Sequence, residues 1–138
     1  MGARRRAREA ALQTLYRLDI NPCDPQVALD ELEGGRERHE SQAEFARDLV
    51  MGAFERMEEI DGHIREAALK WNISRMAVVD RNVLRLATYE MLAYPETPAR
   101  VIINEAIEMA KGFGGEESGT FVNGVLDRIR HNLKRKAE

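Results

Sequence analysis

Four arginines stand close together at the beginning of the chain, namely Arg4, Arg5, Arg6 and Arg8. The planar guanidinium group donates paired hydrogen bonds to phosphate and can stack on an exposed base. The apolar spacing predicts that these arginines begin a helix, where backbone N–H groups already carry partial positive charge and favour acidic residues. Only Glu9 lies near enough in the sequence to offset them. Two interpretations follow: a solvated helix end that serves solubility, or a site that binds RNA or DNA.

Other side chains that could do chemistry are not spaced to act together. Asp61 and His63 lie two residues apart and therefore do not face each other on a helix. Glu105 and Glu108 share a helical face, where paired acids usually meet solvent. The histidines show no metal-ligand spacing with each other or with Cys23, the only cysteine. The sequence therefore predicts no enzyme, no metal site and no cofactor.

Charge is distributed unevenly along the 138 residues, whose net charge is −3. Residues 1–20 hold five arginines and two acidic residues, whereas residues 21–66 hold thirteen acidic and five basic residues. The positive charge is thus concentrated at the N-terminus. The longest stretch without a charged side chain, 118–126, is far shorter than the roughly 20 residues of a membrane helix. No apolar signal-peptide segment follows the basic start, and a single cysteine fits a reducing compartment, so we expect a cytoplasmic protein that does not enter membranes.

Helical periodicity runs along nearly the whole chain and predicts an all-α bundle of about seven short helices. We expect helices over 3–20, from Pro25 to Gly34-Gly35, from Ser41 to Ile60, from Asp61 to about Trp71, from Ser74 or Asp80 to before Pro95, from Pro98 to before Gly112, and through the segment from Phe121 to Leu133. Residues 35–40 are the most linker-like stretch.

Prolines and glycines supply most of the expected helix boundaries. Asp24-Pro25 and Thr97-Pro98 each combine a capping residue with proline at the first helical position. Ser41 and Glu44 have the spacing of a capping box. Gly124 is the exception, because it lies inside a helix, where glycine costs about 1 kcal/mol relative to alanine. We expect close helix packing at Gly124, with a functional role as the second interpretation.

Four segments resemble the NusB family of bacterial transcription antitermination factors: RRRAREAALQTLY (4–16), FARDLV (45–50), DRNVLRLATYEM (80–91) and INEAIEMAKGFGGEESGTFVNGVLDRI (103–129). The resemblance spans nearly the whole chain, and the last segment is long and specific. It implies an N-terminal helical subdomain at about 1–60 packed on a C-terminal one at about 61–138. It also implies a non-enzymatic factor that binds the boxA element of ribosomal RNA leader transcripts. Its partners would be NusE, a small ribosomal protein, and an RNA polymerase antitermination complex.

The resemblance also assigns RNA-binding residues. Arg4, Arg5, Arg6 and Arg8 match the arginine-rich RNA-binding start of the family, so phosphates would supply the negative charge that the helix start lacks. The turn KGFGGEES at 111–118 matches a second RNA element, with Lys111, Phe113, Gly114, Glu117 and Ser118 as the candidates. Lys111 would meet a phosphate, and Phe113 either stacks on a base or fills the end of the helix core. Glu117 stands where the family commonly has Asp, and its longer side chain changes the reach of that contact.

The family's NusE contacts map onto the segment 80–91, where the candidates are Asp80, Arg81, Arg85 and Tyr89. The other interpretation is that Tyr89 belongs to the core and the charges form a solvated face. The resemblance also allows a homodimer through the surface that receives RNA. Two alternatives to the antitermination factor stay open. One is a NusB-like module of a ribosomal RNA methyltransferase, which would require truncation at residue 138. The other is a helical adaptor that binds only proteins.

Overall fold

The computed structural model describes residues 2–33 and 40–135, and these residues form an all-α fold, as predicted. Its helices are α1 (Ala3–Ile20), α2 (Pro25–Glu33), α3 (Glu40–Glu55), α4 (Met57–Ala67), α5 (Val78–Ala93), α6 (Ala99–Gly114) and α7 (Glu116–Asn132), with a short 3-10 helix, η1 (Ile73–Arg75), before α5. The expected stop at Gly34-Gly35 and most of the expected linker at 35–40 lie outside the described residues.

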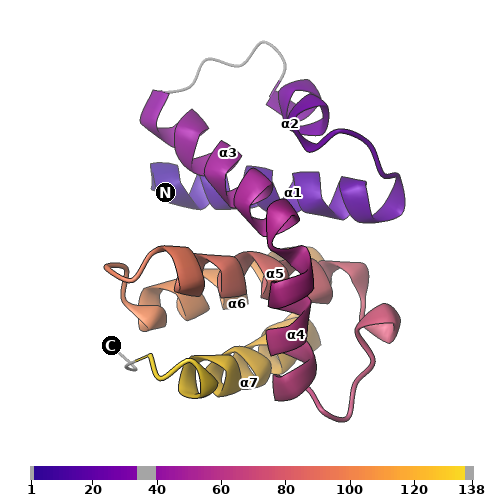
Figure 1. The fold of residues 1–138 in the computed structure, drawn as a ribbon, viewed down its shortest axis with the longest axis vertical. Helices are drawn as coiled ribbons and strands as arrows, with labels where there is room; N and C mark the ends of the chain where they lie inside the picture. The colour runs from indigo at the N-terminus through magenta and orange to yellow at the C-terminus, as the bar shows by residue number, and fades with distance from the viewer. Residues whose placement is uncertain (1, 34–39, 136–138) are drawn as a thin grey trace.

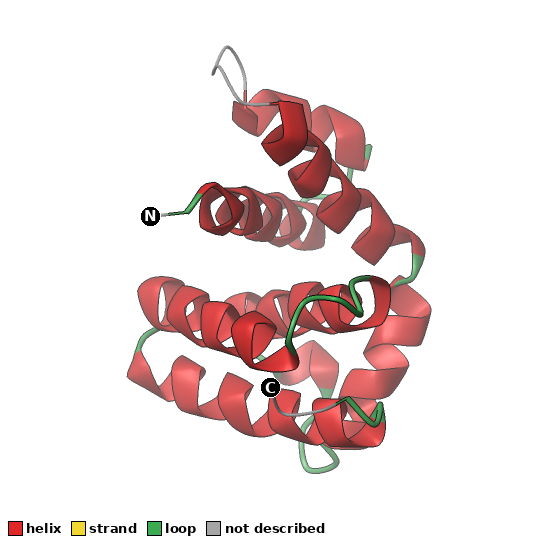
Figure 2. Cartoon of the chain, turned by 90° about the vertical axis from the view of Figure 1, so that its left-hand side faces the viewer, coloured by secondary structure: helices red, strands yellow, loops and turns green. Residues whose placement is uncertain are grey.

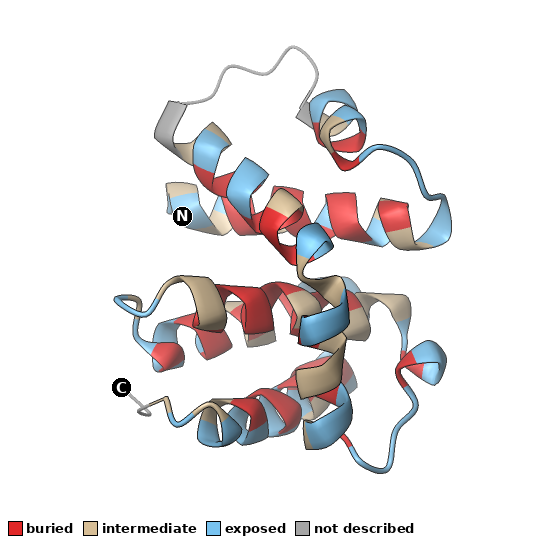
Figure 3. Ribbon diagram, in the orientation of Figure 1, coloured by how far each residue is buried: buried red, intermediate tan, exposed pale blue. Residues whose placement is uncertain are grey.

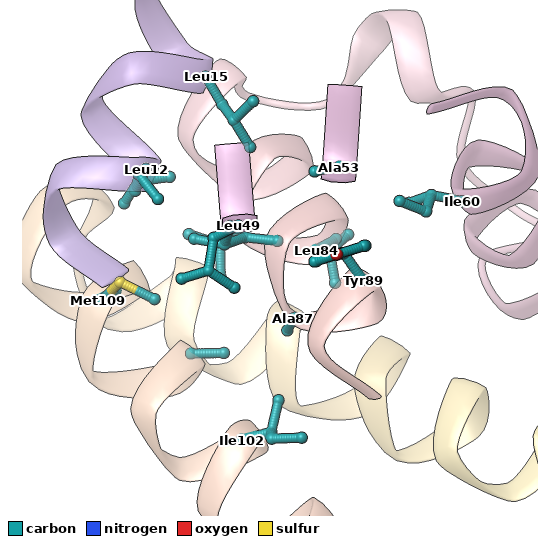
Figure 4. Close-up of a cluster of buried hydrophobic side chains, with 14 of the residues drawn as sticks. Leu12, Leu15, Leu49, Ala53, Ile60, Leu84, Ala87, Tyr89, Ile102 and Met109 are labelled. Carbon is teal, nitrogen blue, oxygen red and sulfur yellow. The ribbon is translucent and has the colours of Figure 1, made fainter. Parts of the chain in front are cut away.

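The helices form two groups that share one core (Figure 1, Figure 2). Helices α1, α2 and α3 pack together, whereas α4, α6 and α7 pack around α5, which also contacts α1 and α3. Both groups contribute buried residues to this core (Figure 3). Leu12 and Leu15 of α1 belong to the same buried cluster as Leu49 of α3 and Leu84 of α5 (Figure 4). Because one core runs through both groups, α5 fixes the position of α1 on the group formed by α4, α5, α6 and α7, the lower group in Figure 1.

Several expected helix boundaries were wrong. Helix α3 begins at Glu40, before the expected cap Ser41, α4 ends at Ala67 rather than near Trp71, and α6 runs through Gly112 to Gly114.

The third helix was expected to continue to Ile60, but α3 ends at Glu55 and α4 begins at Met57, with Arg56 at φ −105° and ψ 20° between them. The apolar spacing continues through this break, since Ala53 before it and Ile60 and Ile64 after it are buried, so periodicity alone could not show it. Asp61, expected as a helix cap, lies inside α4 and accepts hydrogen bonds from Arg85. The subdomain boundary at about residue 60 stays a prediction.

The expectation of close helix packing at Gly124 was also wrong. Gly124 is exposed, and a Cβ atom at this position would meet no atom within 4 Å. The closely packed glycine is instead Gly52 of α3, where a Cβ atom would overlap the ring of Tyr89. Gly52 therefore lets α3 approach α5, and nothing in the described structure explains Gly124.

Candidate nucleic-acid interface

The four arginines at the start of α1 divide into two exposed and two internal side chains. Arg4 and Arg6 are exposed, Arg5 is half-buried, and only 5% of Arg8 is accessible to solvent. Helix α1 packs on α5, so the side of α1 that carries Arg8 faces the lower group of helices. The arginines therefore do not form one uniform basic surface, although they are nearly continuous in the sequence.

Arg8 forms a buried ion pair with Glu90 of α5. Its Nε donates to Glu90 Oε1 at 2.9 Å, and its Nη2 donates to Oε2 at 2.6 Å. Glu90 is only 1% exposed, so both charges lie away from water. Burial alone would lower the pKa of Arg8, but the hydrogen bonds and charge of Glu90 outweigh it and raise that pKa. Because two hydrogen bonds join the buried Arg8 to Glu90, this ion pair fixes α1 on α5.

Arg5 forms a similar two-bond pair with Glu105 of α6, nearer the surface. Its Nε and Nη2 donate to the two carboxylate oxygens at 2.9 and 2.7 Å. The side chains are 30% and 19% exposed, and Glu105 also lies 3.8 Å from Nη1 of Arg8. The hydrogen bond from Arg5 holds the pKa of Glu105 below its ordinary value. Glu105 was expected at the solvent surface, but the structure commits it to the arginine cluster.

Arg4 and Arg6 are the members of the cluster that face solvent. The guanidinium carbon of Arg4 lies 4.0 Å from the centre of the Phe45 ring, a cation–π contact that leaves the side chain exposed. Arg6 forms no ion pair with any described residue. Helical spacing places Arg6 on the same face of α1 as Gln13 and Tyr16, both of which are exposed. This face therefore combines a cation, an amide and an aromatic ring.

Residues 111–118, expected as a turn, form the end of α6, Gly115 and the start of α7, and this junction meets that face of α1. Phe113 is 46% exposed and, with Gln13 and Tyr16, lines a surface hollow of about 240 Å³. Lys111 is exposed, and its Nζ lies 3.9 Å or more from its two acidic neighbours, Glu108 and Glu116. The expected interpretation of Phe113 as a helix-end core residue does not match its exposure. The structure thus brings Phe113 to α1, where the sequence placed only the arginines.

Gly114, Gly115 and Ser118 shape this turn. Gly115 has φ +93°, a backbone conformation that residues other than glycine rarely adopt. Helix α7 begins at the next residue. The Ser118 hydroxyl is buried and donates to the carbonyl of Gly114 at 3.2 Å. A Cβ atom on Gly114 would overlap this hydroxyl. Ser118 therefore closes the turn, whereas Glu117 is exposed beside it.

Three of the four residues expected to contact NusE are committed to internal contacts. Arg81 donates to Asp19 at 2.6 and 2.9 Å, and Arg85 donates to Asp61 at 2.9 and 3.0 Å. Both side chains are about 15% exposed or less, so they do not form a solvated face. Tyr89 is 5% exposed and donates to Asp48, and burial together with the Asp48 charge raises its pKa to about 12.

Asp80 is the exception among these four. Its Oδ1 is buried and receives no hydrogen bond from the described residues. Asp80 lines a surface cavity of about 750 Å³ together with Trp71, Phe121 and Glu117. Trp71 is 56% exposed, and its ring centre lies 5.4 Å from that of Phe121. The sequence predicted only that a helix ends near Trp71 and that Phe121 lies on the last helix, so it gave no sign that the two rings meet at the surface.

Acid is expected to weaken the network around Asp19. Burial alone would raise the Asp19 pKa, but hydrogen bonds from Arg81 and Asn82 lower it from the ordinary 3.8. A carboxyl with a lowered folded-state pKa adds stability above its unfolded pKa, and that stability is lost as the pH falls through the lowered value. Asp19→Asn should therefore cost about 1–3 kcal/mol of unfolding free energy at pH 7. Chemical denaturation should show a smaller loss between pH 7 and pH 3 in this variant than in the wild type.

The matched control is Glu58→Gln, which removes an exposed carboxylate of α4 that forms no ion pair with the described residues. It should leave both the stability at pH 7 and its acid dependence almost unchanged. An Asp19→Asn variant with the acid dependence of the wild type would contradict the importance of the Asp19 network.

The described residues offer neither a metal site nor a membrane-spanning helix. Among the described residues, no group of three or more His, Cys, Asp or Glu side chains could hold a metal ion. In that part of the chain, no helix is both long enough and apolar enough to cross a membrane. The structure instead brings exposed cations and the Phe113 ring to one surface, and the buried Oδ1 of Asp80 and the exposed Trp71 ring to another.

Comparison with known proteins identifies the family. The NusB family model matches residues 5–131. A transcription antitermination protein NusB of Bacillus cereus is 48% identical over 132 residues, which cover 94% of this chain and 98% of that protein. A second such protein, of Heliobacterium modesticaldum, is 46% identical over 132 residues, which cover 96% of this chain but only 64% of that protein. A solved structure of the antitermination factors NusB and NusE in complex with double-stranded RNA matches with a TM-score of 0.88 and 30% identity, covering 96% of this chain and 98% of that one. The chain therefore belongs to the NusB family of non-enzymatic transcription antitermination factors.

Proposed function

We propose that this protein binds boxA-type RNA of ribosomal RNA leader transcripts together with NusE, as part of an RNA polymerase antitermination complex in the bacterial cytoplasm. The match to a structure that contains NusB, NusE and RNA supports both partners. The observation that carries the RNA part is the exposure of Arg4 and Arg6 at a helix start that has no acidic residue in its first turn. A homodimer through the same surface would be the RNA-free state, and RNA would compete with the second copy.

The RNA surface in this proposal consists of Arg4, Arg6, Lys111 and Phe113. The three cations meet phosphates, and Phe113 offers a stacking face, a contact typically worth about 1–3 kcal/mol per base. Exposed Glu117 accepts a hydrogen bond from a base amino group. The roles of the other candidates follow from their contacts: Arg5 and Arg8 hold α1 on the lower helices, whereas Gly114 and Ser118 shape the turn.

The NusE surface in this proposal is the cavity around Asp80. Its buried Oδ1 without a hydrogen-bond donor is suited to accept one from a partner, and the exposed ring of Trp71 supplies apolar contact area. Arg81, Arg85 and Tyr89 do not line this cavity, and they fix α5 through their acidic partners. We therefore place them in the support of the NusE site rather than in its contact surface.

Titration with boxA-type RNA and with a scrambled oligonucleotide of equal length tests the proposed function. We expect tighter binding to the boxA sequence and a further gain when NusE is added. Equal affinity for both oligonucleotides, with or without NusE, would favour the protein-only adaptor. Stimulation of a separate methyltransferase domain, without boxA preference, would favour the methyltransferase module.

Asp80→Asn is expected to weaken NusE binding by about tenfold or more, since a hydrogen bond to a charged group is worth about 1.5–3 kcal/mol. RNA binding by the isolated protein should change little, because Asp80 supplies none of the proposed phosphate contacts, although Glu117 lines the same cavity. Calorimetric titration with NusE measures the first effect, and the boxA titration measures the second. Loss of both activities would indicate a misfolded variant, and unchanged NusE affinity would remove Asp80 from the interface.

A further inference from the structure

We propose that Glu105 limits the affinity of this protein for RNA by occupying Arg5 in place of a phosphate. This inference rests on the proposed RNA-binding function and concerns the regulation of the same surface. Unlike the proposed RNA contacts, Glu105 would compete with the RNA, because it binds the arginine that a phosphate would otherwise bind.

The geometry of the Arg5–Glu105 pair supports competition. Two parallel N–H···O bonds of 2.9 and 2.7 Å join the guanidinium to the carboxylate. Phosphate binds arginine through the same two-bond arrangement, so the carboxylate and a phosphate would use the same donors. The Arg5 side chain is 30% exposed and stands between the exposed Arg4 and Arg6 in the chain. Because Arg5 lies in the first turn of α1 and its side chain is partly exposed, a phosphate at this helix start has access to its guanidinium group.

Anchoring of α1 does not depend on Glu105 alone. Arg8, one helical turn after Arg5, already joins α1 to α5 through a pair whose two side chains are 6% and 2% exposed. A buried pair is costly to break, whereas a pair that is partly exposed contributes less to stability. Helix α1 should therefore stay docked when Glu105 is neutralised. Besides its contact with Arg8 of α1, Glu105 holds Nε and Nη2 of Arg5, the donors that a phosphate would use.

Release of Arg5 from Glu105 should add about one phosphate contact. On a single strand, each such contact contributes about −0.7 to the slope of log affinity against log salt, which corresponds to about fivefold in affinity at 0.1 M salt relative to 1 M. Glu105→Gln keeps the size of the side chain but removes the negative charge. We expect this variant to bind boxA-type RNA about fivefold more tightly at 0.1 M salt, with a slope steeper by about 0.7.

Two comparisons separate competition for Arg5 from a general loss of repulsion. Glu108→Gln removes an exposed carboxylate one turn further along α6, so it should raise RNA affinity much less. In an Arg5→Ala background, Glu105→Gln should give no more than the small gain seen with Glu108→Gln. The salt slope should then be the same with and without Glu105.

Each other outcome overturns the inference. Weaker RNA binding by a folded Glu105→Gln variant would make Glu105 an anchor. A gain that persists in the Arg5→Ala background, or that Glu108→Gln equals, would be simple repulsion. If Glu105→Gln lowers the thermal midpoint, Glu105→Asp supplies a second measurement, because its shorter side chain cannot keep both hydrogen bonds in place and should give a smaller gain of the same sign. Unchanged affinity with normal boxA preference overturns only this inference, whereas absence of any boxA preference in the wild type overturns the proposed function.

Discussion

Glu90→Gln is expected to lower the free energy of unfolding by about 3–5 kcal/mol, the typical cost of leaving one member of a buried ion pair without its partner. Arg8 would keep its charge in a site where it is only 5% exposed and where water cannot replace the carboxylate. Small domains are stable by about 5–15 kcal/mol, so this single change would remove a large share of the total. Urea denaturation at pH 7 measures the effect directly.

Two controls define what this loss means. Glu59→Gln breaks the pair with Arg56 in which both side chains are exposed by 39% or more, and it should cost well under 1 kcal/mol. Replacing both partners, as Arg8→Met with Glu90→Leu, removes both charges and should recover most of the stability lost in Glu90→Gln. A cost for Glu90→Gln as small as that for Glu59→Gln would show that this pair does not hold α1 in place.

Combined Arg4→Ala and Arg6→Ala substitutions are expected to weaken boxA RNA binding about 25-fold at 0.1 M salt. Each arginine accounts for about fivefold if it neutralises one phosphate of a single strand. Both side chains are exposed, and the cation–π contact of Arg4 with Phe45 is worth only about 0.5–1 kcal/mol at such a site, so the fold should be retained. Fluorescence anisotropy with labelled RNA measures the affinity, and circular dichroism checks the helix content.

The matched control is Arg47→Ala with Arg128→Ala. It removes the same charge from exposed positions on α3 and α7, where neither arginine pairs with an acidic residue among those described. We expect less than a threefold effect on RNA affinity. An equal loss in both double variants would mean that RNA responds to net charge alone and that the helix start is not a specific contact.

The fold followed largely from the sequence, because apolar periodicity and two Pro-containing starts carry local information. Helix α1 was predicted over 3–20 and covers Ala3–Ile20. The end of α3 could not be predicted, because the apolar stripe continues through Arg56 and the break depends on backbone geometry. The packing role of Gly52 was equally hidden, since the ring that meets it, Tyr89, lies on another helix.

The sequence predicted which residues belong to the site but not which role each of them has. Similarity to the family grouped the arginines together, whereas their division depends on Glu90 and Glu105, which lie 82 and 100 positions away from their partners in the sequence. The sequence offered only Glu9 as an offset to the charge at the helix start, yet the carboxylates that balance Arg5 and Arg8 come from α5 and α6. Residue type shows that a side chain can bind phosphate, but only the tertiary structure shows whether it is already occupied.

The salt dependence of boxA RNA binding tests the division of the arginine cluster most directly. With Arg4, Arg6 and Lys111 as the three phosphate contacts, log affinity against log salt should have a slope of about −2.1, which should fall to about −0.7 when Arg4 and Arg6 are replaced by alanine. A wild-type slope near −3.5, as expected if all four arginines and Lys111 met phosphates, would contradict this account, and so would an unchanged slope in the double variant.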